Sequence, residues 1–325
     1  MILSSEKMQK VADLKKMIIN HPQFDKAYEQ LLNAYYMNVE TGISEHIICV
    51  GQSGTGKSTL KEKLRDSINP QKNNSKVITP ILIVDTPALP TVKNLAEEML
   101  MKLGDFRYYS GSTIQKTTRV HHYLNQCEVK MIIFDELQHF IDRGKERQSQ
   151  EVADWLKTVI DQSGCSIVLM GLERCEYLFR INEQLRRRFS KRIDLHPFSI
   201  DSHEPFMEFM GVLYAILERS KLTARFDLNN KEFISAIYYA TDGVIANMIK
   251  LFVGVVELLD VSKNKMIEKD IFETAFMENI WIDGKREMNP FNKAFIWQRL
   301  NKPGMPFHHI DYIKEKNDND KKHDN

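Results

Sequence analysis

One stretch of eight residues constrains this chain more strongly than any other part of it. Residues 51–58 read GQSGTGKS, which satisfies the pattern G-x-x-x-x-G-K-[ST] at every fixed position. The apolar run His46–Val50 precedes the motif, and a helical pattern over Leu60–Ser67 follows it. Glycines let the backbone N–H groups of such a loop turn toward phosphate oxygens, and the following helix adds its positive end. The sequence therefore predicts a strand, a phosphate-binding loop and a helix in this order.

The residues of this loop have distinct expected roles. Lys57 is expected to reach the β- and γ-phosphates of ATP, and the Ser58 hydroxyl to ligate Mg²⁺. A chance match in an ordinary turn would lack the strand and the helix on either side. We therefore predict ATP and Mg²⁺ as cofactors, with a catalytic contribution from Lys57. The residues predicted to bind the nucleotide are Gly51, Gln52, Ser53, Gly54, Thr55, Gly56, Lys57, Ser58 and Thr59.

A second motif lies downstream, where the four apolar residues 131–134 end on Asp135 and Glu136. An ordinary strand can also end on acidic residues, but this one follows an intact phosphate loop with another strand between them. We expect Asp135 to hold the magnesium ion and Glu136 to polarise the attacking water. An acidic pair in place of a single Asp favours hydrolysis over binding alone. The sequence thus predicts an ATPase that forms ADP and phosphate, slowly or under the control of a partner.

Strands and helices alternate up to about residue 195, and each predicted strand is almost continuously apolar. That pattern is typical of a parallel sheet with helices on both faces. From Asp201 onward only helical patterns remain. The predicted fold class is an α/β P-loop NTPase of the AAA+ type, followed by a small helical lid domain. The expected divisions are a helical lead-in at 1–42, the ATPase core at 43–200, the lid at 201–282, and an extension at 283–325 that is disordered after about 314.

A basic run, QLRRRFSKR at residues 184–192, closes a predicted helix just before the last strand. AAA+ proteins commonly place an arginine finger here, which is donated to the γ-phosphate of the neighbouring subunit. Arg188 is the first choice for this catalytic role, followed by Arg187 and Arg192. The run also has a plain explanation, because basic residues complement a helix C-terminus and are well solvated. The finger interpretation predicts that the active form is an oligomer.

Composition limits the partners that this chain can have. The 45 basic and 44 acidic residues nearly cancel, so a DNA-binding surface has to come from local segregation of charge. No apolar run approaches the roughly 20 residues of a membrane span, and the N-terminus lacks the apolar core of a signal peptide. The four cysteines are scattered without metal-binding spacing. These features predict a soluble, cytoplasmic protein with no membrane partner.

With these motifs in view, the chain resembles the TniB/TnsC family, AAA+ regulators of Tns-type transposition, including CRISPR-associated systems, related to the MuB and IstB helpers. The resemblance runs from about residue 20 to 280 and depends most on the contexts DELQH and NEQLRRRF. The segments that carry it are HPQFDKAYEQL at 21–31, GQSGTGKST at 51–59, IIFDELQHF at 132–140, VLMGLERCEYLFRINEQLRRRF at 168–189 and TDGVIANMIKLF at 241–252.

The resemblance implies an ATP-dependent oligomer, a ring or helical filament on double-stranded DNA, which links a target-selection factor to the transposase. Basic and hydroxyl side chains of the ATPase core would face the phosphates, and such contacts are independent of DNA sequence and sensitive to salt. Each of these side chains could also be an ordinary solvated residue on a helix face. The candidates are Lys93, Lys102, Arg107, Thr113, Lys116 and Arg119.

Two features depart from the AAA+ pattern. A polar sensor residue often follows the fourth strand of these proteins, but this chain has Gly171-Leu172-Glu173 there. The helical domain often offers an arginine to the nucleotide four residues after a glycine. Here Asn247 stands four residues after Gly243, and the nearest cation, Lys250, lies about one turn too far along. Slow or conditional hydrolysis is consistent with the loss of that arginine.

Other classes of protein share the same motifs. A helicase loader or a replication initiator would also carry them, but the residues after about 285 are too few and too polar for the winged-helix domain that initiators usually add. A signalling NTPase switch would act through protein partners without DNA. The C-terminal aromatics Phe295, Trp297 and Phe307 are either an anchor for a partner or a cover for the ATPase core.

Overall fold

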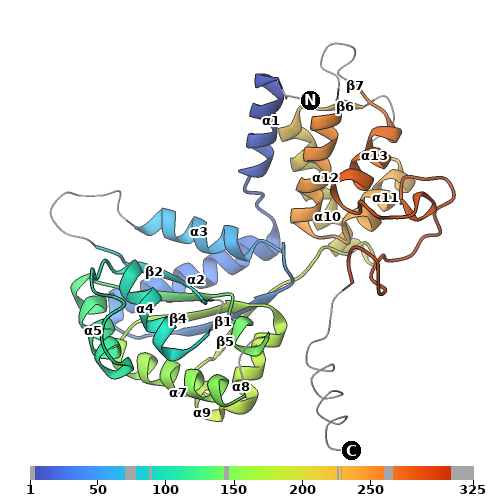
Figure 1. Cartoon of the computed structure of the whole chain (residues 1–325). Coiled ribbons are helices and arrows are strands. Elements are labelled where there is room, and N and C mark those ends of the chain that lie inside the picture. The colour runs from blue at the N-terminus through green and yellow to red at the C-terminus, as the bar shows by residue number, and fades with distance from the viewer. Residues whose placement is uncertain are drawn as a thin grey trace, which may run out of the picture. The chain divides into compact units, whose positions relative to one another are not determined.

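The structure is a computed structural model that describes residues 4–69, 78–87, 90–142, 146–224, 227, 229–259 and 266–308. The chain divides into two compact units (Figure 1). The α/β unit comprises Gln23–Leu195, and the helical unit comprises Met1–Pro22 together with His196–Asn325. Each unit has its own hydrophobic core, so each is described by itself.

A five-stranded sheet forms the centre of the α/β unit. All of its neighbouring strands are parallel, in the order β2-β3-β4-β1-β5, which confirms the predicted parallel sheet. Apart from β5, the strands are almost wholly apolar, as expected where helices cover both faces of a sheet; the edge strand β5 carries Lys191, Arg192 and Asp194. The carboxyl ends of all five strands therefore meet at one edge. The strands are β1 (His46–Gly51), β2 (Ile81–Asp85), β3 (Met131–Asp135), β4 (Ser166–Gly171) and β5 (Lys191–Leu195).

Helices cover both faces of this sheet (Figure 1), and each face has its own core. Val50 and Phe134 are buried on one face with residues of α4, α5 and α7, whereas Cys49 and Ile133 are buried on the other with residues of α2 and α3. Neighbouring residues of β1 and β3 thus point to opposite faces, as the two-residue period of a strand requires. The helices are α2 (Pro22–Thr41), α3 (Lys57–Ile68), α4 (Val92–Lys102), α5 (Thr113–Gln126), α6 (His139–Asp142) and α7 (Glu146–Ser163).

The segment before β5 differs from the single helix predicted up to Arg187. Three short pieces replace it: the 3-10 helix η1 (Glu173–Glu176), α8 (Tyr177–Ile181) and α9 (Glu183–Arg186). Asn182 interrupts them with an extended backbone, and its side chain accepts a hydrogen bond from the Leu185 N–H as the N-cap of α9. Asn competes with helix backbone through such bonds, so it favours a helix start over a helix interior.

The helical unit packs its helices around a core rich in aromatic residues, including Phe209, Phe252 and Phe272. No single helix among the described residues is long and apolar enough to cross a membrane. Helices α11 and α12 together have the length and composition of a membrane span, but the pair is bent by 110° at the break between them. The elements are α1 (Ser5–Lys15), α10 (His203–Ser220), β6 (Thr223–Ala224), α11 (Lys231–Thr241), α12 (Ile245–Leu258), β7 (Met266–Ile267), α13 (Lys269–Asn279) and the 3-10 helix η2 (Arg286–Met288).

Both ends of the chain are placed differently from the expected divisions. The lead-in predicted at 1–42 is split, because α1 buries Val11 and Leu14 in the core of the helical unit whereas α2 covers the sheet of the α/β unit. The described part of the C-terminal extension belongs to the helical unit. It buries Phe295 and Phe307 in the core of that unit. The tail after about 314 lies outside the described residues.

Candidate nucleotide-binding site

The phosphate loop connects β1 to α3 at the carboxyl edge of the sheet. Gly54 and Gly56 have φ angles of 82° and 102°, in the left-handed region where only glycine is free of strain. The loop is braced from within by Thr55, whose hydroxyl donates to the Gln52 carbonyl oxygen at 2.9 Å. The chain therefore enters α3 with the sharply turned backbone that phosphate binding needs, as the motif predicts.

Lys57 lies in the curve of this loop. Its ammonium donates to the carbonyl oxygens of Gly51 at 2.7 Å and Gln52 at 2.8 Å, and the residue is buried. Burial lowers the pKa of Lys57, although the nearby thiol of Cys49 and the carboxylates of Asp135 and Glu136 oppose this shift. A buried ammonium beside the first turn of a helix is suited to binding a phosphate dianion, because the charge is held in place and poorly solvated.

The magnesium candidates come from the end of the loop and from the end of β3. Ser58 is exposed on the first turn of α3, and Asp135 is buried at the end of β3. A hydroxyl and a carboxylate supply the hard oxygen ligands that Mg²⁺ prefers, so the two residues fit this ion in their chemistry. Within the described residues, both carboxylate oxygens of Asp135 already have partners: the Glu136 N–H at 2.8 Å and the Lys61 ammonium at 2.5 Å.

Lys61 was missed by the sequence analysis. Its ammonium also lies 2.9 Å from a carboxylate oxygen of Asp85, which stands opposite Asp135 in the register of β2 and β3. One ammonium therefore contacts the carboxylates at the ends of two neighbouring strands. Burial alone would lower the pKa of Lys61, but its bonds to Asp135 and Asp85 outweigh this effect and raise the pKa. The sequence signal was its spacing, because Lys61 follows Lys57 by four residues and thus lies on the same face of α3.

Glu136 begins the loop after β3 with an unusual backbone. Its φ of 58° is in the left-handed region, which is uncommon for a residue with a side chain and recurs at functional sites. Its carboxylate accepts a hydrogen bond from the side-chain amide of Gln138. Thr86 supports the same turn from β2, because its hydroxyl donates to the Asp135 carbonyl oxygen at 2.6 Å. The predicted catalytic carboxylate is therefore held in a fixed orientation.

Gln138 connects this carboxylate to the end of β4. Its amide oxygen accepts from the Leu172 N–H at 3.1 Å, and the side chain is buried. Gly171 makes room for it, since a Cβ there would lie 2.8 Å from the Gln138 amide oxygen. Gln138 thus reaches the segment Gly171-Leu172-Glu173 after the fourth strand, the position at which the sequence analysis looked for a polar sensor residue. The sequence signal was the glutamine of the DELQH segment, to which the sequence analysis assigned no role.

The candidate finger arginines are bound to carboxylates of their own chain. Arg188 forms a two-pronged ion pair with Asp161, at 2.8 and 2.7 Å, and donates to the Gln184 carbonyl oxygen. Arg187, just after α9, is largely exposed and pairs at 2.8 Å with Glu183, the first residue of that helix. Arg192 pairs with Asp194 and Glu176. A finger role for Arg188 would require its pair with Asp161 to open.

The predicted DNA contacts lie on or between α4 and α5. Lys93 and Arg107 are exposed, Lys102 is exposed beside Asp85 at 3.5 Å, and Thr113 is half-buried. Arg119 is partly buried and pairs with Asp105 at 3.3 Å. These five side chains therefore all reach the surface to some degree, as a contact with phosphates requires.

The prediction for Lys116 is wrong, because its side chain is fully buried and cannot contact DNA in this structure. Its ammonium donates to the carbonyl oxygens of Tyr108 at 2.7 Å and Ser110 at 3.0 Å, and it pairs with Glu97 at 3.1 Å. Three partners satisfy its three N–H donors. A lysine in a polar helix suggests a solvated residue, but the loop before α5 closes over this one.

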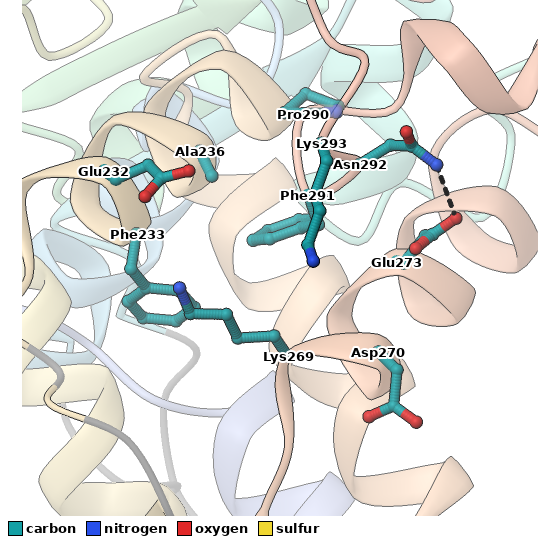
Figure 2. Close-up of a pocket in the computed structure, with 10 residues that line it drawn as sticks. All are labelled: Glu232, Phe233, Ala236, Lys269, Asp270, Glu273, Pro290, Phe291, Asn292 and Lys293. Carbon is teal, nitrogen blue, oxygen red and sulfur yellow. Dashed lines mark hydrogen bonds between the residues drawn. The ribbon is translucent and has the colours of Figure 1, made fainter.

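The helical unit has a hollow of its own between α11, α13 and the segment after η2 (Figure 2). Its volume is about 490 Å³, and Phe233 and Phe291 supply apolar lining. Glu232 and Lys269 give its rim both signs of charge, and Glu273 accepts a hydrogen bond from Asn292 at 3.2 Å. Because acidic and basic side chains both line this hollow, its charge does not favour an anionic ligand, unlike that of the phosphate loop.

Solved structures that resemble this chain share its fold at low identity. The Aeropyrum pernix ORC2 protein, in ADPNP–ADP complexes, gives a TM-score of 0.60 at 14% identity over 84% of this chain and 72% of that one. The A. pernix ORC1 protein in complex with DNA gives 0.61 at 13% identity, over 83% and 69%. Cdc6p from Pyrobaculum aerophilum gives 0.57 at 13%, over 82% and 70%. These likenesses confirm the predicted α/β P-loop fold.

Sequence comparison identifies the family. Curated proteins give no match. The sequence model of the bacterial TniB proteins matches residues 10–199, which is more than half of the chain and includes the phosphate loop, the Asp135-Glu136 pair and the basic run before β5. The match agrees with the resemblance carried by the DELQH and NEQLRRRF segments. The chain belongs to the TniB family.

Proposed function

We propose that this protein is an ATP-dependent, DNA-binding AAA+ regulator of transposition, which assembles on duplex DNA and links a target-selection factor to the transposase. The single observation that carries the proposal is membership of the TniB family together with a complete phosphate loop and acidic pair at one sheet edge. We place the protein in the cytoplasm, where its DNA substrate would be.

In the proposed reaction, ATP binds through the backbone of the loop 51–58 and the ammonium of Lys57. Mg²⁺, held by Ser58 and Asp135, would neutralise charge on the phosphates. Glu136 would orient the attacking water and accept its proton, and Gln138 would keep the Glu136 carboxylate aimed at that water. Arg188 of a neighbouring subunit, once released from Asp161, would stabilise the transition state. Hydrolysis would then depend on assembly, in line with the slow or partner-regulated hydrolysis predicted from the sequence.

Substituting Gln138 tests its place in this reaction. We expect Gln138→Ala to lower kcat for ATP hydrolysis about 10-fold, because one hydrogen bond to a charged acceptor is lost. KM should stay unchanged, since the phosphate loop is untouched. Steady-state phosphate release measures both constants, with Gln126→Ala, an exposed position on α5, as the control. A KM or melting temperature that changes while kcat does not would assign Gln138 a purely structural role.

DNA binding is supported by the charge between α4 and α5 and by a structural neighbour, the A. pernix ORC1 protein, whose structure is in complex with DNA. Lys93, Lys102, Arg107, Thr113 and Arg119 remain the proposed contacts, without Lys116. Phosphate contacts by such residues would be independent of sequence, which suits a protein that accepts many targets.

A second candidate function is that of an initiator, a helicase loader or a signalling switch that acts through protein partners. The likeness to ORC and Cdc6 structures favours the initiator among these. An electrophoretic shift with random-sequence duplex, with and without ATP, separates the signalling switch from the candidates that bind DNA. The proposed regulator shifts the duplex in an ATP-dependent manner, and its affinity for the duplex falls steeply as the salt concentration rises. A switch without DNA would leave the duplex unshifted under every condition.

A further inference from the structure

The loop between α4 and α5 exposes apolar side chains that the proposed phosphate contacts do not use. Phe106 is 94% exposed, Tyr109 is 67% exposed, and Ile114, on the first turn of α5, is 79% exposed. Exposed apolar residues are ordinary when they are scattered singly, but three within nine residues mark a binding surface. We name this surface, made of Phe106, Tyr109 and Ile114, the aromatic loop.

The aromatic loop is held rigidly from below. Lys116 and Arg119 of α5 both donate to the Ser110 carbonyl oxygen at 3.0 Å, and Asp105 accepts from the Arg107 N–H at 2.8 Å. Tyr108 packs against the core of the α/β unit, while its neighbour Tyr109 points outward. A loop fixed in this way cannot fold its aromatics back onto the protein. It also loses little conformational entropy when it binds a partner.

The charge around the aromatic loop identifies the kind of partner. No Asp or Glu occurs between Asp105 and Glu128, in a chain with 44 acidic residues in 325. Asp105 itself is buried and paired with Arg119. Arg107 is exposed between the two aromatics, and Lys102 is exposed at the end of α4. Lys102 is shared with Asp85 at 3.5 Å and Glu98 at 3.7 Å. The segment 106–127 itself places apolar side chains beside cations and contributes no carboxylate, which fits a polyanion with flat apolar faces, the chemistry of nucleic acid.

We infer that Phe106 and Tyr109 insert against the bases of duplex DNA as apolar wedges, so that the protein unstacks and deforms the duplex that it binds. Arg107 and Lys102 contact the phosphates on either side. This inference rests on the proposed function, because it requires the α/β unit to bind DNA, and it adds that binding distorts the duplex. Base-step deformation by wedge residues is independent of base contacts and is favoured at flexible steps.

The test compares the double variant Phe106→Ala/Tyr109→Ala with the wild type. Binding to random-sequence duplex containing 2-aminopurine is titrated at several salt concentrations. We expect affinity to fall about 10-fold or more, because the stacking of bases on both aromatic rings is lost. The slope of affinity against salt should stay unchanged, since no phosphate contact is lost. The fluorescence rise of 2-aminopurine, which reports unstacking, should disappear.

Three matched variants sharpen this test. Phe106→Trp/Tyr109→Phe keeps both aromatic faces and should keep the fluorescence rise. Arg107→Ala should lower the salt slope by about 1. Ile43→Ala removes an exposed apolar side chain of the same unit, before β1, and should change nothing. Nucleotide binding and melting temperature serve as folding controls for all of them.

Two results would overturn the wedge. In one, the double alanine variant binds and unstacks DNA like the wild type. In the other, it loses nucleotide-dependent self-association in the absence of DNA, which would make the aromatic loop an interface between subunits. A wild type that binds no duplex under any condition would instead refute the proposed function, and the wedge with it, so the two failures are distinguishable.

Discussion

Replacing Lys57 with alanine is expected to weaken ATP binding on the order of 100-fold and to abolish nucleotide-dependent assembly on DNA. The ammonium is the one cation in the curve of the phosphate loop among the described residues, fixed by the Gly51 and Gln52 carbonyl oxygens. Its loss would leave the β- and γ-phosphates without their compensating charge. Titration with a fluorescent ATP analogue measures the binding, and light scattering with duplex DNA measures the assembly.

The control for this variant is Lys63→Ala on the same helix. Lys63 lies over the rings of Phe24 and Tyr28, on the side of α3 that packs against α2, so its removal costs one charge without touching the loop. Its ATP affinity should match that of the wild type. Equal melting temperatures would separate loss of binding from loss of fold. If Lys57→Ala binds ATP and assembles like the control, the loop does not bind nucleotide as proposed.

Glu136→Gln is expected to have the opposite effect on assembly. Hydrolysis should fall about 100- to 10,000-fold, the range contributed by a positioned general base, while ATP binding is retained. The substituted amide keeps an oxygen that can accept the hydrogen bond from Gln138, so the local structure should survive. The ATP-bound assembly would therefore persist on DNA. Phosphate release and the lifetime of the assembly after ATP dilution measure the two effects.

Glu151→Gln on α7 is the matched control, since Glu151 is exposed and pairs with Arg147 of the same helix. It should hydrolyse ATP at the wild-type rate. A Glu136→Gln protein that turns over and disassembles like this control would show that Glu136 is not the catalytic carboxylate. Together, the variants at Lys57 and Glu136 separate nucleotide binding from nucleotide hydrolysis.

The parts of the site that the sequence predicted are those built from consecutive residues. The phosphate loop needs only Gly54, Gly56 and Lys57 in order, and their local backbone defines its shape. The parallel sheet was predictable because a strand buried on both faces is apolar throughout, as Ile132 and Ile133 illustrate. Local patterns of this kind do not depend on which distant segment packs beside them.

The parts that escaped prediction depend on tertiary pairing. The link from Gln138 to Leu172 requires β3 and β4 to be neighbours, which the order of strands along the chain does not specify. The pair of Lys61 with Asp135 likewise requires α3 to pack over that edge. The sequence of α1 is amphipathic, but this pattern does not specify which core the apolar face of the helix joins. In the structure, Val11 lies in the core of the helical unit.

Imaging the purified protein with random-sequence duplex by negative-stain electron microscopy tests the proposed function most directly. The samples contain ATP, a nonhydrolysable analogue or no nucleotide. The proposed function predicts rings or filaments on the DNA with either nucleotide and none without, and an Arg188→Ala sample should hydrolyse ATP more slowly once assembled. Monomers under every condition would contradict both the assembly and the finger, and would leave a P-loop switch that acts alone or through protein partners.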